Sequence, residues 1–158
     1  MKKIIFLAFV VILSSCGVKK NLVSTKAAKA AEAMAGLKNK QLYRFITDWT
    51  GVKYKLGGLD KSGIDCSGFA LILEKEIYGL TLPRRSRDQA LAVKKKDMSN
   101  LKEGDLIFFA FGGNEVDHVG VYLRDGFFVH ASTTRGVIVD DLSLPIYQNS
   151  IVKTGTLK

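Results

Sequence analysis

Three side chains in this sequence of 158 residues have the chemistry of a nucleophilic catalyst: Cys66, His118 and His130. A cysteine thiolate is a nucleophile, and a nearby histidine can take the thiol proton and later pass it to a leaving amine. A second polar group is then needed to hold that histidine in one orientation and one tautomer. The two histidines are candidates for these two roles, so the three residues together have the groups that acyl transfer requires.

Cys66 falls in the first turn of a predicted helix. Asp65 is a good N-cap residue, the apolar stretch 69–77 follows it, and Gly79 is a natural stop. The unpaired backbone N–H groups and the dipole at a helix start favour a negative group. We therefore expect the pKa of the Cys66 thiol to be lowered.

The two histidines lie on neighbouring strands of a predicted hairpin whose loop contains residues 124–126. Side chains alternate between the faces of a sheet, so a two-residue loop would put the two imidazoles on opposite faces. A three-residue loop, or an equivalent bulge, pairs Gly120 with His130 and makes His118 a diagonal neighbour on the same face. We predict this second arrangement, because Gly126 occupies the position that needs a left-handed backbone.

Each of these residues also has a structural interpretation. A lone cysteine is usually a small buried apolar side chain, and a single histidine is more often structural than catalytic. A Cys/His/His zinc site is a further possibility, although a cysteine at a helix start, far in sequence from both histidines, is not a typical ligand pairing. The helix start at Cys66, the hairpin and an N-terminal export signal favour catalysis.

The elements that position these residues are helices first and strands afterwards. Apolar residues at helical spacing over 42–49 predict a helix that ends at Gly51, a glycine-rich loop covers 53–62, and Ser86 is expected to cap a short helix over 87–93. Strands are predicted at 105–111, 118–123, 127–131, 136–140 and 151–157. Helices followed by an antiparallel meander predict an α+β fold.

Residues 1–15 have the pattern of an export signal. Two lysines precede an apolar run over 4–13, which is too short to span a bilayer comfortably, and Leu13-Ser14-Ser15-Cys16-Gly17 resembles a bacterial lipobox. We expect residues 1–15 to be removed and Cys16 to be lipidated, with 16–40 as a flexible or weakly helical tether to a domain over 41–158. Cys66 is then the sole remaining thiol, which excludes a disulfide within the chain.

The formal net charge of +9 comes mainly from the N-terminal part of the chain. Residues 1–40 hold eight lysines and one glutamate, whereas 41–158 hold 16 basic and 14 acidic residues. A nearly neutral domain lacks the basic face that a nucleic acid requires, so we expect no nucleic-acid partner. The basic tether beside Cys16 suits an anionic lipid or wall-polymer surface.

At these residues the sequence resembles the NlpC-type cell-wall peptidases, a papain-like family of bacterial cysteine endopeptidases. The resemblance spans about residues 41–157. It is carried by six motifs in the family's order and spacing: Tyr54 with Gly57-Gly58, Asp65-Cys66-Ser67-Gly68-Phe69, Pro83-Arg84 with Ser86 and Gln89, Gly104-Asp105-Leu106, His118-Val119-Gly120-Val121-Tyr122, and Phe128-Val129-His130-Ala131. One departure is Glu103, where the family usually has a proline.

The resemblance implies a papain-like α+β fold with N-terminal helices packed on a central antiparallel β-sheet. It makes Cys66 the nucleophile, His118 the base and His130 the polar residue that orients the base. Tyr54 is implied beside the nucleophile, where it can assist the oxyanion site. Three further residues match positions near the family's substrate groove: Asp65, Ser67 and Arg84. The implied mechanism requires no metal and no organic cofactor.

The family cleaves peptide bonds in peptidoglycan stem peptides, often between D-glutamate and the diamino acid. Alternatives left open are a cut between the diamino acid and D-alanine, an amidase or acyl-transfer activity, and a non-catalytic wall-binding lipoprotein. We expect a monomer in the cell envelope, held by its lipid anchor at a membrane facing the wall. Gly17 after Cys16 favours the outer membrane where a cell has two membranes.

Overall fold

The computed structural model describes residues 16–157, with side chains described from residue 25 onward. The export signal predicted for 1–15 and the side chain of Cys16 lie outside the described residues. The helices of the described part are α1 (Cys16–Ala35), α2 (Lys40–Trp49), α3 (Cys66–Tyr78), α4 (Ser86–Ala92), the 3-10 helix η1 (Met98–Asn100) and α5 (Pro145–Gln148). Its strands are β1 (Leu59–Asp60), β2 (Gly63–Ile64), β3 (Lys94–Lys95), β4 (Leu106–Phe109), β5 (His118–Arg124), β6 (Phe127–Ser132), β7 (Gly136–Asp141) and β8 (Ile151–Thr156). Among these described residues, no helix combines the length and the apolar character needed to cross a membrane.

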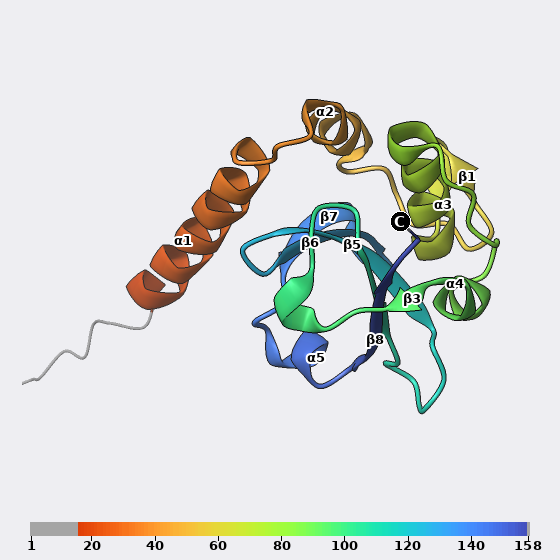
Figure 1. Ribbon diagram of the computed structural model, residues 1–158. Helices are drawn as coiled ribbons and strands as arrows, with labels where there is room; N and C mark the ends of the chain where they lie inside the picture. Colours follow the sequence, from red (N-terminus) through yellow and green to blue (C-terminus); the bar gives the residue numbers. More distant parts are fainter. Residues whose placement is uncertain (1–15, 158) are drawn as a thin grey trace, which may run out of the picture.

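A six-stranded antiparallel sheet forms the centre of the molecule (Figure 1), with strand order β3-β8-β4-β5-β6-β7. Strands β4 to β7 form the predicted meander, and β8 returns to pair with β4 on the other side. The short β1–β2 hairpin stands apart and precedes α3. The α+β class predicted from the order of elements is confirmed.

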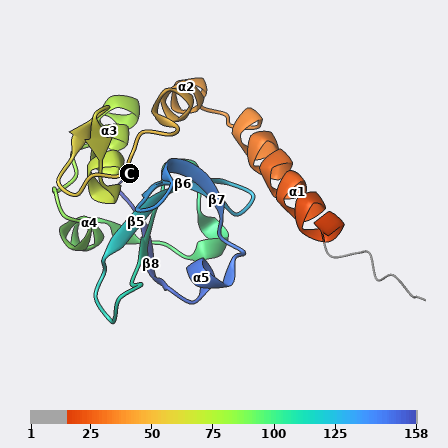
Figure 2. The same cartoon turned by 180° about the vertical axis from the view of Figure 1, so that it is seen from behind.

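Every residue of β4 and of β6 is buried. Because side chains alternate between the two faces of a sheet, both faces are covered there. Helices α2 and α3 lie over one face and α5 over the other (Figures 1 and 2). Val121 and Val129 belong to the larger core beneath α2 and α3. Phe109, Phe128 and Tyr147 belong to a second core on the α5 side.

Helix α2 has the apolar stripe that its sequence predicted. Asn39 caps it, because the Asn39 Oδ1 atom accepts hydrogen bonds from the backbone N–H groups of Gln41 and Leu42 at 2.9 and 3.1 Å. Gly51 follows with a φ of 86°, a left-handed conformation suited to glycine. The buried residues of α2 are the predicted ones: Leu42, Phe45, Ile46 and Trp49.

The segment 16–40 differs from the expected tether, because α1 is one continuous helix of 20 residues. Ala33, near its C-terminal end, and Leu37, in the connection to α2, are buried, and Leu37 is part of the larger core. The packed part of the chain therefore begins before residue 41. The alanine-rich sequence gives little apolar periodicity, so this packing is set by tertiary contacts.

Two side chains hold the connection between α1 and α2 against the sheet. The Glu103 carboxylate accepts hydrogen bonds from the backbone N–H groups of Lys38, at 2.8 Å, and Asn39, at 3.1 Å. Arg124 donates a hydrogen bond to the carbonyl oxygen of Gly36. Glu103, the departure from the family pattern, thus fastens the N-terminal helices to the domain.

The structure also corrects one predicted helix cap. Helix α4 begins at Ser86, and its N-cap is Arg85, which makes no side-chain capping hydrogen bond. Ser86 is therefore the first residue of the helix and not its N-cap, which is the preceding residue. The short elements β1, β2, β3, η1 and α5 were not predicted, because they have too few residues for a recognisable period.

Candidate active site

Cys66 is the first residue of α3, as the sequence predicted. Asp65 is the N-cap, and its Oδ1 atom accepts a hydrogen bond from the backbone N–H of Gly68 at 2.7 Å. The Cys66 side chain is buried, with 5% of its surface exposed. Its sulfur faces the backbone N–H of Val119, the residue that follows His118 on β5. The helix start is thereby placed against the first residues of that strand.

The lowered thiol pKa expected from the helix start is wrong for this structure. Burial, with a smaller contribution from the negative charge of Asp65, raises the pKa of the Cys66 thiol to about 11. The backbone N–H groups of Val119, Ser67 and Cys66 itself act in the lowering direction and do not compensate. Cys66 is therefore a protonated thiol at neutral pH.

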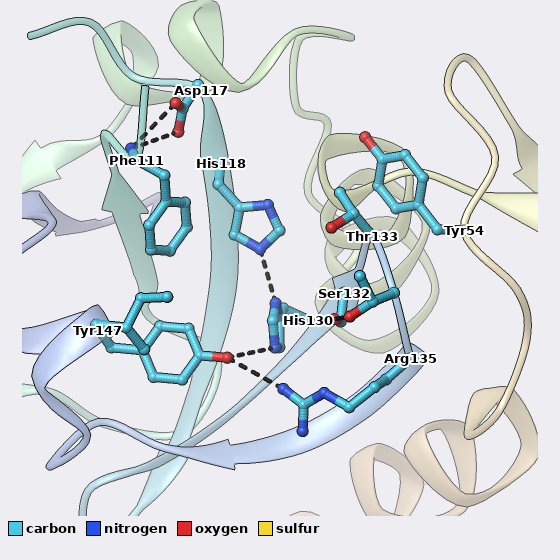
Figure 3. Close-up of a pocket in the computed structure, with 11 residues that line it drawn as sticks. Tyr54, Phe111, Asp117, His118, His130, Ser132, Thr133, Arg135 and Tyr147 are labelled. Atoms are coloured by element: carbon cyan, nitrogen blue, oxygen red, sulfur yellow. Dashed lines mark hydrogen bonds between the residues drawn. The ribbon is translucent and has the colours of Figure 1, made fainter. Parts of the chain in front are cut away.

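The predicted placement of the two histidines is confirmed. Val121 pairs with Val129, which makes His118 and His130 diagonal neighbours on one face of the sheet. Their imidazoles are joined by a hydrogen bond of 2.7 Å between His118 Nε2 and His130 Nδ1 (Figure 3). The turn at 125–126 has two residues with positive φ, of 52° and 80°, and a β-bulge just before it supplies the equivalent of the longer loop.

Both imidazoles are buried among aromatic rings. The ring of Phe111 lies 5.6 Å from that of His118, and the ring of Phe128 stacks 4.8 Å from that of His130, measured between centroids. Burial, with a smaller contribution from the neighbouring His130, lowers the pKa of His118 to about 3. Burial likewise lowers the pKa of His130, even though Asp140 acts in the opposite direction. Both rings are neutral at pH 7.

The low pKa of His118 predicts that the domain loses stability as the pH falls. In the unfolded chain this ring has its ordinary pKa of 6.5, so the unfolded state binds protons first as the pH drops. The free energy of unfolding should fall by about 1.4 kcal/mol per pH unit between about pH 6 and pH 4 from this group. Urea denaturation at several pH values measures the slope, which His118→Gln should flatten. Equal slopes for the two chains would contradict the prediction.

A carboxylate that the sequence analysis missed lies beyond His130. Asp140, on β7, has its Oδ2 atom 3.1 Å from His130 Nε2 and accepts a hydrogen bond of 2.5 Å from the Tyr147 hydroxyl. Arg135 pairs with the same carboxylate through both terminal nitrogens. Burial alone would raise the pKa of Asp140, but the hydrogen bonds from His130, Arg135 and Tyr147 keep it below its usual value. Asp140 is therefore ionised at neutral pH.

A cleft of about 530 Å³ opens beside the two histidines (Figure 3). Tyr54 lies on one side, and burial together with the nearby Cys66 raises the pKa of its hydroxyl. The ring nitrogen of His118 that does not contact His130 points toward the side where Tyr54 lies. The other lining residues are Phe111, Asp117, Ser132, Thr133, Thr134, Arg135, Ile146 and Tyr147. The cleft thus gives a ligand access to His118, and Cys66 lies near Tyr54 at its edge.

The three remaining predicted site residues form a cluster of their own. Arg84 donates two hydrogen bonds to Asp65, at 2.8 and 2.6 Å, and one to the Ser67 hydroxyl at 3.0 Å. Burial would raise the pKa of Asp65, but Arg84 and two backbone N–H groups lower it. These side chains are not among those lining the cleft. They brace the loop and helix start that carry Cys66.

The zinc-site interpretation finds no support in the described geometry. Across residues 16–157, no group of three His, Cys, Asp or Glu side chains has an arrangement suited to holding a metal ion. His118 Nε2 and both nitrogens of His130 are instead engaged in hydrogen bonds within the protein. The site instead has a buried thiol and two neutral imidazoles joined by a hydrogen bond, groups that could carry out acyl transfer.

Comparison with known proteins gives consistent matches. The model of the NlpC/P60 family matches residues 51–156. The murein DD-endopeptidase MepS/murein LD-carboxypeptidase of Escherichia coli strain K12 is 46% identical over 101 residues, covering 64% of this chain and 53% of that protein. The gamma-D-glutamyl-L-lysine dipeptidyl-peptidase of Bacillus subtilis strain 168 is 36% identical over 104 residues, covering 64% of this chain and 35% of that protein.

Solved structures agree with the sequence matches. An NlpC/P60 family protein from Bacillus cereus ATCC 10987 superposes with a TM-score of 0.68 at 33% identity, covering 73% of this chain and 39% of the other. The chain therefore spans about half, or less, of the length of these relatives. What is shared is the domain that carries the helix start, the hairpin and the cleft.

Proposed function

The chain belongs to the NlpC/P60 family, and on that premise we propose that it is a peptidoglycan hydrolase that cleaves a peptide bond in stem peptides. One observation carries the proposal: His118 and His130 are hydrogen-bonded at 2.7 Å on the strand pair that meets the buried helix start at Cys66. A nucleophile, a base and a group that orients the base are the parts needed for cysteine-dependent acyl transfer. The relatives' names, which include endopeptidase and dipeptidyl-peptidase, support the same reaction class.

In the proposed mechanism, the Cys66 sulfur attacks the scissile carbonyl carbon while His118 takes the thiol proton. General-base transfer fits the neutral resting pair, because the pKa of the thiol is raised and that of the imidazole is lowered. The backbone N–H of Cys66, assisted by the Tyr54 hydroxyl, stabilises the oxyanion. His118 then protonates the leaving amine and activates the water that releases the acyl group.

The proposed scissile bond joins D-glutamate to the diamino acid, as in the substrate named for the Bacillus subtilis relative. The name of the Escherichia coli relative favours a second candidate, a bond between the diamino acid and D-alanine. Both cuts use the same acyl-transfer groups, so product identity has to decide between them.

Digestion of a defined muropeptide tests the proposal and separates the two bonds. A substrate with the stem L-Ala–D-Glu–diamino acid–D-Ala should give a sugar-linked L-Ala–D-Glu fragment and a free diamino acid–D-Ala dipeptide if the D-glutamyl bond is cut. Cleavage before D-alanine would instead release that amino acid alone. Mass spectrometry distinguishes the two products. An intact substrate after prolonged incubation with folded protein would contradict the proposed activity and favour a wall-binding role.

We also propose that residues 1–15 direct export and that lipidated Cys16 anchors a monomer at a membrane facing the wall, at the outer membrane in a two-membrane cell. The n-region lysines, the apolar run and the lipobox-like Cys16 support this proposal. Metabolic labelling with palmitate should mark the chain, and Cys16→Ser should lose the label and leave the membrane fraction. Equal labelling of both chains would overturn the anchor.

A further inference from the structure

Three polar side chains form a diagonal line across neighbouring strands on one face of the sheet. His118 on β5 and His130 on β6 are offset by two residues, as their register requires. His130 pairs directly with Ile138 on β7, so Asp140 is offset from His130 by two residues in the same sense. Hydrogen bonds of 2.7 Å and 3.1 Å join the three in order. The line ends at an ionised carboxylate.

The order of these hydrogen bonds determines which ring nitrogens carry protons. An ionised carboxylate accepts hydrogen bonds only, so His130 Nε2 must carry the proton that faces Asp140. The Nδ1 atom of the neutral His130 ring is then an acceptor, and His118 Nε2 must donate to it. This leaves the Nδ1 atom of His118 unprotonated, with a lone pair free to accept a proton.

We propose that Asp140 is a positioning residue that fixes the tautomers of His130 and His118 in sequence and so keeps His118 Nδ1 ready to accept the Cys66 proton. The kinetic part of this role rests on the proposed function of Cys66 and His118. The carboxylate acts through two imidazoles and does not line the cleft. Its negative charge also favours the imidazolium that forms at His118 when the thiol loses its proton.

Tyr147 is the donor that would reverse the direction of the hydrogen bond between His130 and His118 if Asp140 were absent. Its hydroxyl donates to Asp140 at 2.5 Å and lies 3.4 Å from His130 Nε2. Arg135 lies 3.3 Å from the same hydroxyl and can donate to it. Without the carboxylate, Tyr147 is expected to donate to His130 Nε2, which moves the His130 proton to Nδ1. His118 Nε2 must then accept, so its Nδ1 carries a proton and cannot serve as the base.

Long-range ¹H–¹⁵N spectra of the histidine rings in the full chain test the tautomers without any substrate. The chain has two histidines, so His118→Gln assigns both sets of signals. At pH 7, where burial keeps both rings neutral, both should carry the proton on Nε2. In Asp140→Ala both should shift to the Nδ1–H form. A wild-type His118 ring protonated on Nδ1 would overturn the proposal, whatever the activity of the protein.

The kinetic test compares single and double variants on a stem-peptide substrate. Asp140→Ala should lower kcat by about 10³-fold with little change in KM, somewhat less than the roughly 10⁴-fold cost of a wrong tautomer in a serine-protease triad. Adding Tyr147→Phe removes the reversing donor and should recover at least about tenfold in kcat, since neither tautomer is then imposed. A purely structural role predicts further loss in the double variant.

The neighbouring carboxylate provides a matched control. Asp141 follows Asp140 on β7, points to the other face, and accepts a hydrogen bond from the backbone N–H of Ser143. Asp141→Ala should leave kcat and both tautomers unchanged.

Wild-type kcat in Asp140→Ala, or a double variant slower than the single variant, would overturn the proposal. If neither the wild-type chain nor any variant cleaves the substrate, the result counts against the proposed function. The tautomer spectra still decide the role of Asp140 in that case.

Discussion

Replacing the Cys66 sulfur with oxygen, in Cys66→Ser, is expected to lower kcat for stem-peptide hydrolysis by at least about 10⁴-fold. Serine fits the space and keeps a proton to donate, so the packing at the start of α3 should survive. The hydroxyl is a far weaker acid than the thiol. The base that must deprotonate it is itself weak, because burial lowers the pKa of His118 to about 3. Initial rates at saturating substrate measure the effect.

The second cysteine of the chain supplies the matched control for this substitution. Cys16→Ser also replaces a sulfur with an oxygen, but at the N-terminal end of α1, and should leave kcat unchanged. Circular dichroism and the urea midpoint check that Cys66→Ser remains folded. A serine variant that retains more than about a tenth of the wild-type kcat would show that Cys66 is not the nucleophile.

His118→Gln is expected to lower kcat by about 10⁴-fold with a smaller effect on KM. Glutamine has a similar size and can still donate a hydrogen bond to His130, but it cannot take up a proton near neutral pH. Without the base, the Cys66 thiol stays protonated, since its own pKa is raised to about 11. Raising the pH should therefore restore part of the activity of the variant as thiolate forms.

His130→Gln provides a graded comparison for this second prediction. His130 contacts His118, and its proposed role is to orient that ring, so its loss should cost less, about 10²-fold in kcat. Steady-state rates between pH 6 and pH 10 separate the two variants. The assignment of His118 as the base would be contradicted if His118→Gln retained the wild-type rate at pH 7, or if its rate did not rise with pH.

The parts of the fold that local pattern controls could be predicted from the sequence. The apolar stripe of α2, the capped start of α3 at Asp65 and the strands of the meander follow from spacing and from turn residues. The shared face of His118 and His130 was also predictable, because residues 124–126 fix the hairpin register. Each of these conclusions depends on contacts within a short stretch of chain.

The parts that depend on tertiary burial could not be predicted in this way. The pKa of Cys66 depends on what covers the thiol, and desolvation there outweighs the helix start that the sequence reveals. Leu37 is buried in the core, and Glu103 and Arg124, far along the chain, bond to the backbone on either side of it. Neither effect has a local signature.

Asp140 falls between these two cases. The diagonal rule that places His118 beside His130 also places Asp140 beside His130, provided that the β6–β7 register is known. The turn between those strands lacks an Asn-Gly or Asp-Gly pair to set that register, so the sequence alone leaves the carboxylate unassigned.

In the proposed reaction, a thiol at the start of α3 cleaves peptidoglycan stem peptides with the help of two hydrogen-bonded histidines. The most direct test digests one purified peptidoglycan preparation with the wild-type chain and with Cys66→Ala in parallel, and analyses the products by mass spectrometry. New peptide ends are expected from the wild-type chain and none from the variant. The same fragments from both chains at similar rates, or no fragments from a folded wild-type chain, would contradict the proposed reaction.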